Sequence, residues 1–149
     1  MTPPSSNLGL SLIMLATGVG IPIMAALNSG LGTRLGSPWL AAFILLLTGA
    51  VVSGVALVVI GLPPSLTLAA PPRFFLGGFL VAFYVLSVTA IAPRIGVGNA
   101  IFLVLLGQIL AAATIDRFGL FGAPEAPVTA RRWVGIGLMI VGVFLARRI

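Results

Sequence analysis

Residues 94–119 read RIGVGNAIFLVLLGQILAAATIDRFG, a long apolar run with one amide side chain near its middle. At 1.5 Å per residue, a helix of this length crosses a membrane. Gln108 falls about 18 Å after Gly96 and about 12 Å before Asp116 on that rise. An uncharged amide near the middle of the bilayer costs free energy unless it finds a partner. Gln108 is therefore expected either to bond a neighbouring helix or to face a wet cavity.

The composition is that of a polytopic membrane protein. Of the 149 residues, 60% are hydrophobic and 7% are charged, whereas about 25% of residues in soluble domains are charged. The net charge of +6 comes from eight Arg, no Lys, one Asp and one Glu. These arginines lie singly or in pairs between apolar runs, which is typical of membrane-boundary anchors and not of a nucleic-acid-binding surface.

The absence of cysteine and histidine excludes disulfides, thiol chemistry and the usual transition-metal ligands. No metal and no cofactor are therefore expected. The first 33 residues contain neither Lys nor Arg, so no ordinary signal peptide is expected either. No phosphate-cradling glycine loop and no paired carboxylates at helix spacing occur, which argues against an enzyme.

Five apolar runs predict an all-α membrane protein with five transmembrane helices in a single domain over residues 1–149. Pro22 is expected to kink the first helix, and Pro93 is expected to close the third. Residues 29–38 are rich in turn-forming residues and predict a connector. Trp39 and Trp133 fit anchors at the membrane surface. The spans are expected at about 8–28, 39–60, 74–92, 96–115 and 133–146.

The arginines divide evenly between the two sides of a five-span chain. One side carries Arg73, Arg117, Arg131 and Arg132, and the other carries Arg34, Arg94, Arg147 and Arg148. A polytopic protein normally has an excess of basic residues on the cytoplasmic side. A tie of four against four predicts insertion in both orientations. Two oppositely inserted copies are then expected to pair as an antiparallel dimer of ten helices, which is an inverted-repeat architecture. The alternative is a fixed topology set by other cues, such as a folding partner.

Several local motifs make the chain resemble the short YdcZ-like members of the drug/metabolite transporter superfamily. They are APRIGV at 92–97, GQ at 107–108, IDRFGLFG at 115–122 and NSGL at 28–31. The resemblance covers nearly the whole chain. It implies a multi-pass protein of the bacterial inner membrane, a transport-like role, and a unit of two antiparallel five-helix copies that are identical or come from paired genes.

Two differences from related proteins bear on the first helix. Members of this family often carry a Gln four residues before Asn28, where this chain has Met24. The short four-helix multidrug exporters are similar in plan, but they use a membrane-embedded Glu in the first helix. This chain has no acidic residue there, so no carboxylate is expected to couple transport to protons.

Four polar residues are candidates for substrate binding. Gln108 is predicted to line a central pathway or to act as interhelical glue, worth about 0.6–2 kcal/mol. Asn28 is predicted either to bind substrate or to cap the first helix before Gly30. Tyr84 and Ser87 share a helix face and are predicted to meet substrate through their hydroxyls or to pack against glycines of another helix.

Two further groups of residues are assigned to gating and assembly. Asp116 is predicted to form a gating ion pair with Arg34 or Arg94, or else to be solvated at the membrane boundary. Gly135 and Gly142 suit a close helix–helix contact and are predicted to lie at the dimer seam.

The function expected from these residues is small-molecule transport by alternating access. The candidate polar groups are neutral, which favours a neutral or zwitterionic substrate. One alternative is a dual-topology ion channel, in which Ser, Thr and Asn side chains or backbone carbonyls select the ion. Another is a non-transporting membrane assembly subunit, in which Gln108 bonds only to protein.

Tags on both termini test the orientation prediction. If the chain inserts both ways, each tag is detected on both sides of the membrane, because the even arginine split gives neither orientation an advantage. The measurement is accessibility of each tag in sealed inside-out and right-side-out vesicles. Detection of each tag on a single side in every molecule contradicts dual insertion.

Overall fold

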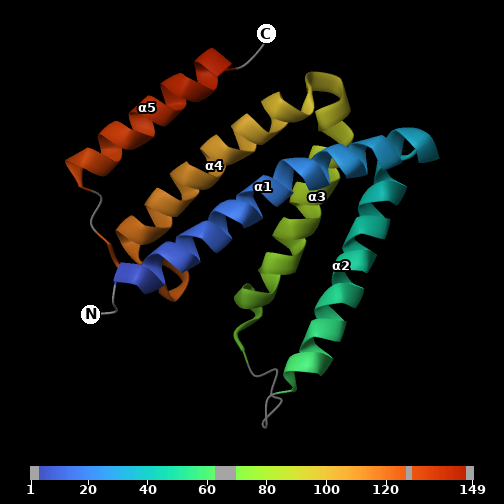
Figure 1. Ribbon diagram of the computed structural model, residues 1–149, viewed down its shortest axis with the longest axis horizontal. Coiled ribbons are helices and arrows are strands. Elements are labelled where there is room, and N and C mark those ends of the chain that lie inside the picture. Colours follow the sequence, from blue (N-terminus) through green and yellow to red (C-terminus); the bar gives the residue numbers. More distant parts are fainter. Residues whose placement is uncertain (1–3, 63–69, 127–128, 147–149) are drawn as a thin grey trace. The chain divides into compact units, whose positions relative to one another are not determined.

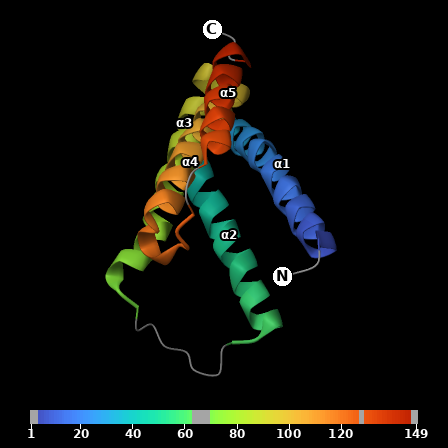
Figure 2. The same ribbon diagram turned by 90° about the vertical axis from the view of Figure 1, so that its left-hand side faces the viewer.

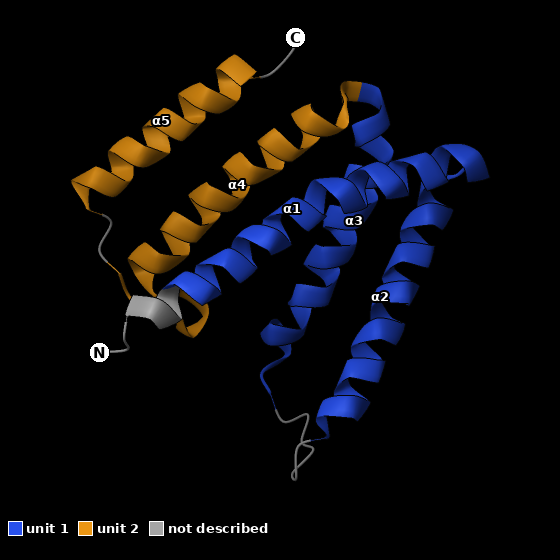
Figure 3. Ribbon diagram, in the orientation of Figure 1, with its two compact units in different colours: residues 1–94 blue, residues 95–149 orange. Residues whose placement is uncertain are grey.

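The computed structural model describes residues 4–62, 70–126 and 129–146, and the regular structure in these ranges is helical (Figure 1). The chain divides into two compact units, residues 1–94 and residues 95–149 (Figure 3). The first unit contains α1 (Pro4–Leu35), α2 (Pro38–Ile60), the short 3-10 helix η1 (Pro72–Phe75) and α3 (Leu76–Ile95). The second contains α4 (Val97–Phe118), the 3-10 helix η2 (Leu120–Gly122) and α5 (Ala130–Ala146).

Four helical segments are long and apolar enough to cross a membrane. They are Leu8–Leu35, Pro38–Ile60, Pro72–Ile95 and Val97–Phe118. The fifth helix, α5, has 17 residues and spans about 25 Å, the lower limit for a bilayer-crossing helix. The all-α, multi-pass prediction is confirmed, and α5 as a fifth span stays a prediction. Arg147 and Arg148, which were expected to follow it, lie outside the described residues.

The first helix is longer than the sequence pattern predicted. It continues through Pro22 to Leu35, so the predicted end at Asn28, the capping role for Asn28 and the connector over 29–38 are wrong. Proline removes only one helical hydrogen bond, and ending the helix inside hydrocarbon would leave several backbone groups without partners. The third helix likewise passes Pro93 and ends at Ile95, two residues beyond the proline that was predicted to close it.

The turn between α1 and α2 is encoded by three consecutive residues. Gly36 has a positive φ of 65°, and the Gly36 and Ser37 amides donate to the carbonyls of Thr33 and Gly32. This is the Schellman pattern, which satisfies the last carbonyls of a helix. The Ser37 hydroxyl then accepts from the Leu40 amide, and Pro38 occupies the first turn of α2, so one helix ends and the next begins with almost no loop.

Small residues let α1 and α2 approach closely beside this turn. A β-carbon on Gly32 would lie 3.2 Å from the Pro38 Cα and 3.6 Å from the Ala41 Cβ. Ala41 and Ala42 have no exposed surface, and Ala25 is also buried. Alanine and glycine at a helix contact are typical of membrane proteins, where close packing and not hydrophobic burial holds helices together. From this contact the two helices diverge (Figures 1 and 2).

Large apolar side chains lie mainly on the outside of the chain. Val58, Val59 and Ile60 are 76–85% exposed, and Phe79 and Leu138 are similarly open. The buried apolar residues are Ala, Val and one Ile. Exposed apolar surface on this scale is rare on soluble monomers, and it is the surface expected to face lipid or other helices.

A leucine at position 32 tests the α1–α2 contact. We expect Gly32→Leu to lower the free energy of unfolding by about 1–3 kcal/mol, because the new side chain overpacks the contact with Pro38. Thermal unfolding in mild detergent measures the change. Gly30→Leu is the matched control, since nothing lies within 4 Å of a β-carbon there. Equal midpoints for the two variants would contradict the close contact.

Candidate solute site

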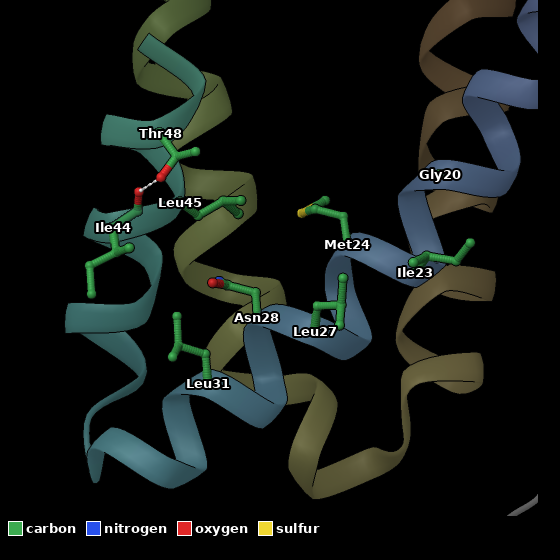
Figure 4. Close-up of a pocket in the computed structure, with 9 residues that line it drawn as sticks. All are labelled: Gly20, Ile23, Met24, Leu27, Asn28, Leu31, Ile44, Leu45 and Thr48. Atoms are coloured by element: carbon green, nitrogen blue, oxygen red, sulfur yellow. Dashed lines mark hydrogen bonds between the residues drawn. The ribbon is translucent and has the colours of Figure 1, made fainter. Parts of the chain in front are cut away.

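A pocket of about 360 Å³ lies between the diverging helices α1 and α2 (Figure 4). Both walls come from the first compact unit, and most of the surface is aliphatic. The lining residues are Gly20, Ile23, Met24, Leu27, Asn28, Leu31, Ile44, Leu45 and Thr48. A concave apolar pocket with few polar groups is the usual form of a small-molecule site.

The polar side chains of this pocket are those of Asn28 and Thr48. The Thr48 hydroxyl donates to the Ile44 carbonyl of its own helix at 2.8 Å, which satisfies its proton. Asn28 points from α1 toward α2 (Figure 4) and is 5% exposed. Asn28 is therefore the main hydrogen-bonding side chain of an otherwise apolar pocket.

A hydrogen bond to α3 fixes the Asn28 amide. Its Nδ2 donates to the Thr89 Oγ1 at 2.5 Å, and that hydroxyl donates in turn to the Val85 carbonyl at 2.7 Å. Thr89 is 2% exposed and lies on the buried face of α3, four residues after Val85. Because the amide nitrogen is held this way, the Asn28 carbonyl oxygen stays available to accept a hydrogen bond from a solute.

Tyr84 and Ser87 lie on α3, one turn apart, and neither lines the Asn28 pocket. Both are partly buried. The Tyr84 Oη is enclosed and has no hydrogen-bond partner among the described residues. Since a buried hydroxyl without a partner is costly, Tyr84 is the stronger of these two candidates, and the substrate role of both stays a prediction.

Gln108 belongs to the second unit and is exposed on α4. No hydrogen bond joins its amide to another residue in the described part of the chain. An amide that is exposed on a membrane-length helix still needs a partner in hydrocarbon. The grouping of Gln108 with Asn28 around one pathway stays a prediction.

An ion pair closes the connection between α4 and α5. Arg132 donates to the Asp116 carboxylate at 2.6 Å, and the two side chains are 38% and 36% exposed. The Ala126 amide donates to the Asp116 carbonyl at 2.8 Å. The structure thus pairs Asp116 with an arginine of its own unit, whereas the sequence suggested Arg34 or Arg94; a gating role for Asp116 stays a prediction.

The glycines assigned to the dimer seam are open in the single chain. A β-carbon on Gly135 or Gly142 would meet nothing within 4 Å. The buried residues of α5 are Ile136 and Val143, each one position after a seam glycine. The glycine face of α5 is therefore free to approach another helix.

Thr89 and Met24 were not among the candidates from sequence. Thr89 is identifiable only as a polar residue within the apolar stripe Val85, Val88 and Ala92 of α3, a weak signal because threonine often bonds its own helix. Met24 lies one turn before Asn28 and lines the same pocket.

Comparison with known proteins identifies a family for this chain. The family model described as "Putative inner membrane exporter, YdcZ" matches residues 9–145, nearly the whole chain. No curated protein and no solved structure matches the sequence.

A double-mutant cycle tests the ion pair between α4 and α5. For Asp116→Asn and Arg132→Gln we expect a coupling below about 1 kcal/mol that falls further with salt, because both side chains are more than a third exposed. Denaturant unfolding in detergent measures it. A coupling of several kcal/mol, insensitive to salt, would mean that the pair is shielded from water.

Proposed function

Because this chain belongs to the YdcZ family of inner-membrane exporters, we propose that it moves a small molecule by alternating access as a dimer of two oppositely inserted copies. The family match and the four apolar helices make it a multi-pass integral protein of the inner membrane and a transporter by family. The observation that carries the proposal further is the Asn28 pocket.

The chemistry of that pocket favours an uncharged or zwitterionic solute with an apolar body. Its aliphatic lining contributes no charge, and Asn28 offers a neutral acceptor. An unpaired ionic group in such surroundings would lose its hydration without compensation. A solute that places a hydroxyl or amide N–H against Asn28 and its apolar part against Met24 and Ile44 satisfies both demands.

Alternating access requires two equivalent states, and an antiparallel pair of identical chains supplies them by symmetry. The even division of arginines gives no preferred orientation. Gln108 supports the pairing, because an amide exposed on α4 needs a partner in hydrocarbon and a second copy offers the same amide. We place Gly135 and Gly142 of α5, as a fifth span, at the seam between the copies.

The remaining candidates act along the same pathway in this proposal. Tyr84 and Ser87 present hydroxyls from α3 as the solute moves past Asn28. Asp116 changes its partner, between Arg132 and an arginine of another loop, Arg34 or Arg94 of the oppositely inserted copy, as the two access states exchange.

Variants at Asn28 and Thr89 distinguish two roles of Asn28: binding a solute and joining α1 to α3. After a thermal-shift screen of neutral and zwitterionic solutes identifies a ligand, we expect Asn28→Ala to weaken its binding about ten-fold, the worth of one hydrogen bond in a dry pocket. Uptake of that solute into proteoliposomes should fall in parallel.

Thr89→Val is the matched control. This variant removes the partner of the Asn28 amide, but Thr89 does not line the pocket, so we expect lower thermal stability and a smaller loss of solute binding than in Asn28→Ala. Equal binding by the wild type and Asn28→Ala would overturn the proposed site. Flux orders of magnitude faster than carrier turnover would favour the channel, and no flux of any stabilising solute would favour an assembly subunit.

A further inference from the structure

A second pocket, of about 240 Å³, lies where three helix ends of the first unit meet. The last turns of α1 and α3 and the first turn of α2 surround it, close to the Gly36–Ser37 turn. Most of its lining surface is apolar, as in the Asn28 pocket, but it also includes one arginine and three hydroxyl side chains. Its main lining residues are Ser29, Thr33, Pro38, Thr89, Pro93 and Arg94.

Ser29 is the unusual side chain of this pocket. Six other hydroxyls in the helices donate to the carbonyl four residues earlier, the ordinary way to satisfy a hydroxyl in a membrane helix. Ser29 does not: it is 7% exposed, and its Oγ has no hydrogen-bond partner among the described residues. The six that do are Thr17, Thr33, Thr48, Ser53, Thr89 and Thr114.

The other two hydroxyls of the pocket already donate hydrogen bonds to backbone carbonyls. Thr33 donates to the Ser29 carbonyl, and Thr89 donates to the Val85 carbonyl while it accepts from Asn28. The Ser29 hydroxyl proton is therefore the one in this pocket that lacks an acceptor. A buried hydroxyl without an acceptor costs free energy unless a bound molecule supplies the acceptor.

The charge of the pocket is positive. Arg94 lines it and forms no ion pair or hydrogen bond with any residue in the described ranges. The C-terminal ends of α1 and α3 each contribute about half a negative charge, and the N-terminus of α2 contributes about half a positive one. The positive charge of Arg94 exceeds the net negative charge of these helix ends, and no carboxylate lines the pocket.

We propose that this pocket binds an oxyanion, a carboxylate or phosphate group, whose charge pairs with Arg94 and one of whose oxygens accepts from the Ser29 hydroxyl. The buried Ser29 hydroxyl has no acceptor among the described residues, and Arg94 is exposed and has no ion-pair partner there, so an oxyanion gives a partner to both. Arg34 and Arg94 stand in the last turns of their helices, where the chain leaves the hydrocarbon. A soluble anion or the phosphate of a lipid headgroup can therefore reach the site. The inference does not rest on the transport proposal, because the Asn28 pocket has its own lining.

The test is thermal unfolding of the full-length protein in nanodiscs, with two sources of phosphate. In one arm, inorganic phosphate is titrated into nanodiscs of phosphatidylcholine alone. In the other arm, phosphatidylglycerol replaces part of the phosphatidylcholine in phosphate-free buffer. We expect a saturable rise of the unfolding midpoint in at least one arm, since a ligand that binds only the folded state stabilises it by mass action. The responding arm identifies the source.

Two variants are expected to lose this response. Ser29→Ala and Arg94→Gln should each raise the half-saturating concentration of phosphate or phosphatidylglycerol about ten-fold or more, because each removes a charge-assisted hydrogen bond. Without the anion, Ser29→Ala should be at least as stable as the wild type, because it deletes a hydroxyl that has no partner.

Matched controls carry the same substitutions elsewhere. Ser53→Ala removes a hydroxyl that bonds the Gly49 carbonyl, and Arg73→Gln removes an arginine from the opposite end of the α3 segment. Both should respond like the wild type. No stabilisation in either arm, a wild-type response in Ser29→Ala, or an equal loss in Arg94→Gln and Arg73→Gln would overturn the site.

Discussion

A polar group inside hydrocarbon must find a partner within the protein, because no water is there to replace one. This constraint explains why α1 runs through Pro22 to Leu35 without ending in the bilayer. It also explains the helix hydroxyls that bond the preceding turn and the Asn28–Thr89 bond that joins α1 to α3. In the described part of the chain, the Ser29 and Tyr84 hydroxyls are buried without a partner, and no hydrogen bond joins the Gln108 amide to another residue. These residues are therefore the candidates for binding a solute, an ion or another helix.

The two pockets of the first unit differ in the molecules that they suit. The one between α1 and α2 is aliphatic and holds a neutral amide, so it suits an apolar solute with a single hydrogen-bond donor. The one at the helix ends holds an unpaired hydroxyl and an arginine, so it suits an oxyanion. Asn28 and Ser29 are neighbours in sequence but face different pockets, because successive residues point about 100° apart around a helix. A single turn of α1 thereby contributes to both.

Helix packing in this chain depends on small residues and short turns. Gly32 and Ala41 permit the closest approach of α1 and α2, and the Asp116–Arg132 pair joins α4 to α5 at an exposed boundary. The remaining apolar surface has no partner within the chain. In a bilayer that surface faces lipid or other helices.

The sequence by itself determined the helical membrane class, four of the spans, the family and the candidacy of Asn28, because long apolar runs and their rare polar residues are local features. The predicted ends of α1 and α3 were wrong. Proline and glycine usually end a helix in water, but in lipid the cost of leaving backbone groups without partners keeps the helix going. Only the tertiary structure decided that Thr89 holds Asn28, that Arg132 takes Asp116, and that the Ser29 hydroxyl stays unpaired in a pocket with Arg94. Each of these contacts depends on which helices pack against each other. The hydrogen bond between Asn28 and Thr89 joins residues 61 positions apart, so no local sequence pattern predicts it.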